Sequence, residues 1–84
     1  MNVEVRFFAS LREAAGVGSM RLALPEAAGF DALLEALAAQ LPAQAVAALR
    51  AENVRLARNQ ELLQPPFVLA DGDELAFLPP VTGG

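Results

Sequence analysis

Apolar and polar side chains alternate at the start of the chain. Val3, Val5 and Phe7 fall on one side of residues 2–8, and the residues between them are polar. A period of two is typical of a strand that buries one face. Phe8 interrupts the polar side, so the pattern predicts one aromatic side chain on the outer face, near the end of this strand.

A short helix and a second strand are expected next. Ser10 followed by Glu13 is typical of a capping box, in which a hydroxyl and a carboxylate bond free amide groups at a helix start. This predicts a helix from Leu11 that stops near Gly16. Residues 20–24 alternate again, which predicts a second strand that pairs back on the first.

A helical stripe of apolar residues indicates the main helix. The stripe starts at Phe30 and continues three, four, seven and eleven residues later, at Leu33, Leu34, Leu37 and Leu41. We expect this stripe to pack on the sheet and Pro42 to close the helix. Asp31 falls in the first turn, where the helix dipole favours an acid. The Ala-rich residues 43–51 predict either a shorter helical segment or an irregular connection.

The rest of the chain predicts three short strands. They are expected around residues 54–56, 62–63 and 75–78. The breaks between them are indicated by Asn59-Gln60, Pro65-Pro66 and Asp71-Gly72-Asp73. Pro79-Pro80 has no amide hydrogen to donate to a sheet, so we expect it to end the last strand.

The order strand, strand, helix, strand, short strand, strand predicts an α+β fold. The expected architecture is a ubiquitin-like β-grasp roll, with a mixed sheet of about five strands and one main helix packed on it. Residues 1–78 are expected to form this β-grasp domain, and residues 79–84 an extended C-terminal diglycine tail.

The length and the net charge of the chain limit the classes of function that it can have. At 84 residues the chain has room for one core, and a hydrophobic content of 55 % can supply it. The net charge of −4 argues against a nucleic-acid or anionic-membrane partner, which would favour a basic surface. The sequence shows no charged leader and no apolar run near the roughly 20 residues of a membrane span, so we expect a cytoplasmic protein.

Several reactive residue types are missing. There is no Cys, His, Tyr or Trp, and all six cationic side chains are Arg. This excludes thiolate and imidazole metal ligands, a thiol nucleophile and the usual general base. We therefore expect neither a metal site nor an internal active site, and no catalysis by the chain alone.

The C-terminal sequence Pro-Pro-Val-Thr-Gly-Gly indicates chemistry on the terminal carboxyl group. Gly83 and Gly84 make a thin end without Cβ atoms that can enter the active site of another protein. A carboxylate is a poor electrophile, so it must first be converted to a mixed anhydride with AMP. We expect a separate ATP-using enzyme to do this, with no cofactor bound by the chain itself.

Three segments resemble one known family. They are VRFFASLREAAG at 5–16, RNQ at 58–60 and DGDELAFLPPVTGG at 71–84, and they resemble the small subunit of molybdopterin synthase, a ubiquitin-like sulfur carrier. The resemblance implies that a ubiquitin-activating-like adenylyltransferase adenylates Gly84, which then becomes a thiocarboxylate. Its sulfur would build the molybdopterin dithiolene inside the large subunit, in a heterotetramer of two large and two small subunits.

The resemblance also implies roles for particular residues. Gly84 would bear the sulfur, while Gly83, Thr82 and Val81 would thread the channel of the partner. The apolar residues expected to dock on the partner are Phe8, Leu62 and Leu78, where the family often has an aromatic in place of Leu78. Arg12 matches an arginine that can pair with acids on the partner. The plainer interpretation is that the apolar residues border the core and that Arg12 is only solvated.

Three other functions remain open at this point. A sulfur carrier for thiamin thiazole synthesis or tRNA thiolation would end in the same diglycine. A protein modifier would have Gly84 joined to lysines of its targets. A β-grasp interaction module would have an inert tail. The PPVTGG ending and the length favour the molybdopterin branch.

Overall fold

A computed structural model describes residues 1–80. In chain order its elements are β1 (Asn2–Phe7), α1 (Ala9–Ala15), β2 (Ser19–Ala23), α2 (Phe30–Ala38), α3 (Ala43–Leu49), β3 (Arg55–Arg58), β4 (Glu61–Leu63) and β5 (Glu74–Leu78). The strands form one sheet in the order β2-β1-β5-β3-β4. β1 and β5 pair in parallel and the other neighbours are antiparallel.

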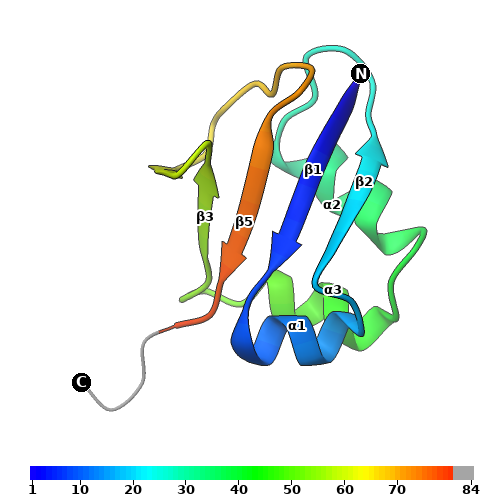
Figure 1. Ribbon diagram of the computed structural model, residues 1–84, viewed down its shortest axis with the longest axis vertical. Helices are drawn as coiled ribbons and strands as arrows, with labels where there is room; N and C mark the ends of the chain where they lie inside the picture. The colour runs from blue at the N-terminus through cyan, green and yellow to red at the C-terminus, as the bar shows by residue number, and fades with distance from the viewer. Residues whose placement is uncertain (81–84) are drawn as a thin grey trace.

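The helices lie against one face of this sheet. Figure 1 shows α2 and α3 behind the strands and α1 below the end of β1. A parallel central pair, antiparallel flanking strands and helices on one side make the ubiquitin-like β-grasp arrangement that the sequence predicts. The expected main helix is α2, and two shorter helices accompany it.

The core lies between the sheet and the helices. Phe7 of β1 pairs in register with Phe77 of β5, and their rings stack with centroids 6.0 Å apart at 13°. Both rings are buried, as are the leucines of the helical stripe within α2, which are Leu33, Leu34 and Leu37. The apolar face predicted from the alternation in the strands and the apolar stripe predicted for the main helix therefore pack together in one layer. Both predictions are confirmed.

The boundary between the first strand and the first helix is not where the sequence places it. β1 ends at Phe7, and Phe8 is the N-cap of α1 without a side-chain capping bond. The predicted capping box is therefore wrong, since Ser10 lies inside the helix. The carbonyl oxygen of Phe8 already accepts the amides of Leu11 and Arg12, at 3.0 and 3.3 Å. The helix thus starts two residues before the expected position.

α2 ends at Ala38, four residues before the proline expected to close it. A residue that precedes a proline is disfavoured in the helical conformation, so Leu41 cannot continue the helix. Leu41 still packs against the core through a tightened turn, in which Gln40 and Leu41 donate to the carbonyl oxygen of Leu37. Pro42 instead caps the start of α3, so residues 43–49 form a helix and not an irregular connection.

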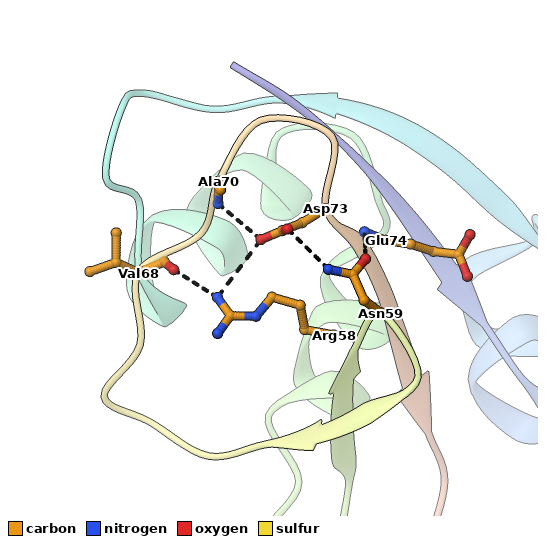
Figure 2. Close-up of polar contacts among 6 residues, drawn as sticks. All are labelled: Arg58, Asn59, Val68, Ala70, Asp73 and Glu74. Carbon is orange, nitrogen blue, oxygen red and sulfur yellow. Dashed lines mark hydrogen bonds and ion pairs between the residues drawn. The ribbon is translucent and has the colours of Figure 1, made fainter.

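The β3–β4 turn and the start of β5 share a polar network around Asp73 (Figure 2). Asp73 is buried, and its carboxylate accepts the amide of Ala70 at 2.9 Å and Nδ2 of Asn59 at 3.2 Å. Arg58 lies 3.8 Å from this carboxylate and donates to the carbonyl oxygen of Val68 at 2.8 Å. Two of the segments that carry the resemblance therefore meet here and hold β5 in place.

Within the range that the structure describes, no helix is long and apolar enough to cross a membrane. Nor do residues 1–80 bring together three or more acidic, His or Cys side chains that could hold a metal ion.

Candidate docking face

The face of the sheet turned away from the helices carries a line of small and apolar side chains. Leu62 of β4 pairs with Ala57 of β3, Ala57 pairs with Ala76 of β5, and Ala76 pairs with Arg6 of β1. Paired residues share a face, so this row runs across four strands. It is apolar from β4 to β5 and ends at a cation on β1.

A second row lies toward the end of β5. Leu78, half-buried, pairs with Arg55 of β3. Phe8 follows β1 in an extended conformation, with φ −121° and ψ 150°. Its side chain therefore falls on the face opposite Phe7.

We call Phe8, Ala57, Leu62, Ala76 and Leu78 the outer patch. Phe8 is 42 % exposed and Leu62 69 % exposed, although both are large and apolar. The structure thus brings the three docking residues expected from the sequence onto one face. Leu78 is half-buried and Ala57 is buried, so the exposed apolar surface of the patch comes mainly from Phe8 and Leu62. Large exposed apolar side chains gathered on one face are typical of interaction sites.

Arg12 lies beside Phe8. It shares a surface hollow with Phe8, Arg6, Gly18 and Ser19. A Cβ atom on Gly18 would come within 3.2 Å of Nε of Arg12, so the glycine lets the guanidinium lie close over the backbone. Two arginines therefore line the same hollow as the exposed Phe8, in a chain whose net charge is −4.

The C-terminal segment leaves the fold at the same end of the sheet. Phe7 and Phe77 are in register, so β1 and β5 end side by side (Figure 1). Pro79 and Pro80 follow directly and border a hollow with Asn53 and Arg55. Phe8 and Leu78 of the outer patch therefore lie at the end of the sheet from which this segment continues. The predicted tail residues Val81, Thr82, Gly83 and Gly84 lie outside the described residues, and their roles stay predictions.

Two arginines at the outer patch were not among the predicted site residues. Arg6 ends the first row and forms an exposed ion pair with Glu74 at 3.6 Å, while Arg55 faces Leu78. The alternation along β1 already places Arg6 on the outer side. Arg55 could not be found in this way, because its neighbour on the last strand depends on the register of β3 with β5.

Comparison with known proteins relates the chain to one family and to several proteins named as sulfur carrier subunits. Residues 5–84 match the ThiS family. The chain is 40 % identical over 82 residues to the molybdopterin synthase sulfur carrier subunit of Escherichia coli K12, covering 98 % of this chain and 99 % of the relative. It is 36 % identical over 86 residues to the protein of the same name in Chlamydomonas reinhardtii, covering 100 % of both.

Solved structures share the fold of the chain. SAMP1 from Haloferax volcanii superposes with a TM-score of 0.83 at 30 % identity, covering 100 % of both chains. A chain from the complex of subunits 1 and 2 of the Helicobacter pylori molybdopterin-converting factor matches over 100 % of both chains, with a TM-score of 0.63 and 29 % identity. Since the family match and the curated relatives span nearly every residue, the chain belongs to the ThiS family.

Proposed function

We propose that this protein carries sulfur on its C-terminal carboxyl group for the synthesis of molybdopterin. The observation that carries the proposal is the 40 % identity, over 98 % of the chain, to a relative named as the sulfur carrier subunit of molybdopterin synthase. An exposed apolar patch at the end of the fold from which the C-terminal segment departs supports it, because a carrier must dock while presenting its terminus.

The chemistry takes place in two steps at Gly84. In a separate ubiquitin-activating-like adenylyltransferase, the carboxylate attacks the α-phosphorus of ATP and pyrophosphate leaves. Hydrosulfide released from the sulfur donor then attacks the acyl carbon, the bond to the AMP oxygen breaks and AMP departs with its electron pair, and the thioacid loses its S–H proton to leave a thiocarboxylate. The protein contributes the acyl group, while ATP and catalysis belong to its partner, so the chain needs no bound cofactor and is not an enzyme alone.

The outer patch would serve both partners in turn. Phe8, Leu62 and Leu78 dock on the activating enzyme and afterwards on the large subunit of molybdopterin synthase, where the sulfur passes to a pterin precursor. Arg12 pairs with acids on the partner. We propose a cytoplasmic heterotetramer of two large and two small subunits, in which residues 81–83 line the approach of Gly84 to the reaction.

Intact mass spectrometry tests the loading step. After incubation with the cognate activating enzyme, ATP and a sulfur donor, we expect one oxygen atom of the chain to be replaced by sulfur, and no change without ATP. Addition of the large subunit and a pterin precursor should then return the chain to its original mass and yield molybdopterin. An unchanged mass, with an enzyme shown to be active on another carrier, would refute the proposal.

A protein modifier is the second candidate. Solved neighbours named small archaeal modifier protein 1 favour it, at TM-scores of 0.80 and 0.76. In that case the carboxyl group of Gly84 would be joined to amines of other proteins. A cell lysate with ATP and tagged protein would show a ladder of conjugates for a modifier and a single band for a sulfur carrier. Carriers for thiamin or tRNA would load identically but leave the pterin precursor unchanged.

A further inference from the structure

Ala9 has an unusual backbone conformation. Its φ is 49°, in the left-handed region that residues with a Cβ atom disfavour. The residue is exposed, so packing of its methyl group does not account for the conformation. Strained residues of this kind persist where the surrounding structure requires them, and they gather at functional sites.

Both neighbours of this turn are anchored in the core. Phe7 at the end of β1 is 2 % exposed and Leu11 in α1 is 4 % exposed, so the chain must pass from strand to helix between them. Phe8 remains extended and its carbonyl oxygen accepts the first helical amides. The reversal therefore falls at Ala9, which has the positive φ.

The position of the reversal decides where Phe8 points. Successive side chains of an extended segment alternate between faces, so the ring of Phe8 lies opposite that of Phe7, on the outer patch. A reversal one residue earlier would end the extended conformation at Phe8 and remove its ring from that face. The start of α1, which carries Arg12, would turn with it.

We propose that Ala9 is a positioning residue, whose left-handed conformation holds Phe8 and Arg12 in the arrangement that a partner recognises. This rests on the proposed docking function of the outer patch. The side chain of Ala9 need not touch the partner. If the ring of Phe8 is already ordered in the free protein, binding does not lose the conformational entropy that ordering a mobile ring would cost.

Three variants separate positioning from stability. Ala9→Gly relieves the cost of the left-handed conformation but also opens the positive-φ extended region that a Cβ atom forbids, so it should widen the range of backbone conformations at this turn and loosen Phe8. Ala9→Asn keeps a side chain that tolerates this conformation, and should preserve the arrangement. Ala27→Gly is the matched control, because Ala27 is also exposed with a positive φ of 59°. It follows the end of β2, which pairs with the start of β1, at the opposite end of the sheet from Phe8.

The first measurement uses the free chain and needs no partner. In Ala9→Gly, NMR relaxation should show a lower order parameter at Phe8, and the amides of Leu11 and Arg12 should exchange about tenfold faster. Ala9→Asn and Ala27→Gly should match the wild type at these amides. All three should unfold at the wild-type temperature or above. Unchanged order and exchange in Ala9→Gly would overturn the proposal.

The second measurement is calorimetric titration with the large subunit of molybdopterin synthase. Ala9→Gly should raise the dissociation constant about three- to tenfold, whereas Ala9→Asn and Ala27→Gly should stay within about twofold. Equal weakening by the two glycine variants, or native affinity in Ala9→Gly, would refute positioning. If the wild type fails to bind, the docking function is refuted, and the order of Phe8 in the free variants still decides whether Ala9 directs it.

Discussion

Asn59, in the turn after β3, and Glu74, at the start of β5, are joined by two hydrogen bonds. The amide of Asn59 donates to the carbonyl oxygen of Glu74 at 2.8 Å, and the amide of Glu74 donates to Oδ1 of Asn59 at 3.0 Å. Asn59 also has φ 50°, a conformation that asparagine tolerates well, and its Nδ2 donates to Asp73 (Figure 2). One residue thus closes the β3–β4 turn and fixes the start of β5.

Replacement of Asn59 by alanine should therefore weaken the whole fold. Asn59→Ala removes both side-chain hydrogen bonds and leaves a less tolerant residue in the left-handed conformation. We expect the free energy of unfolding, measured with urea, to fall by about 2 kcal/mol. Asn53→Ala, at an exposed position of the α3–β3 connection, should change it by less than about 0.5 kcal/mol. Equal effects would show that the contacts of Asn59 contribute nothing.

The two aspartates of the turn before β5 should differ sharply in their contribution to stability. Asp73 is buried, and its carboxylate accepts hydrogen bonds from the amide of Ala70 and from Asn59 and lies near the guanidinium of Arg58. Asp73→Ala leaves these groups without the carboxylate and should lower the free energy of unfolding by about 2–4 kcal/mol. Asp71 accepts the amide of Asn2 in an exposed bond, and Asp71→Ala should cost about 1 kcal/mol or less. Thermal and urea unfolding of the pair measure the difference, and a reversed order would contradict the network.

Leu62 should matter for binding and not for folding. It is 69 % exposed, so Leu62→Ser should change stability by less than about 0.5 kcal/mol while weakening binding to the large subunit about tenfold. Val68, 61 % exposed on the β4–β5 connection and outside the outer patch, provides the matched control. Val68→Ser should bind as the wild type does. If both variants bind normally, Leu62 is not part of a docking face.

A longer C-terminus should stop sulfur loading without disturbing the fold. One alanine added after Gly84 moves the carboxyl group by a residue and puts a Cβ atom at the reacting end. We expect intact mass spectrometry to show no incorporation of sulfur. The thermal midpoint should be unchanged, because β5 ends at Leu78. Normal loading of this variant would contradict the requirement for a terminal diglycine.

Predictions from local patterns were confirmed for the elements whose apolar residues repeat with the period of a strand or a helix. The alternation in β1 and β5 and the stripe in α2 put apolar residues on one face, and these faces became the core. The expected turn at Asn59-Gln60 also formed, with positive φ at both residues. The boundary at Phe8 was missed, because alanine has no local preference for the conformation of Ala9. That conformation arises because Phe7 and Leu11 are both drawn into the core.

Local chemistry along the chain was therefore sufficient to predict the fold class and the apolar layer, while the role of Gly84 stays a prediction. The register of the strands, in contrast, decides which side chains lie around Leu78. Ala57 and Ala76 join the outer patch, and Arg55 borders it, because β3 pairs with β5 at one particular offset. A shift of β3 by one residue against β5 would send Ala57 and Arg55 to the other face. That offset depends on contacts between residues far apart in the chain, among them Asn59 with Glu74, and no short stretch of sequence contains both partners.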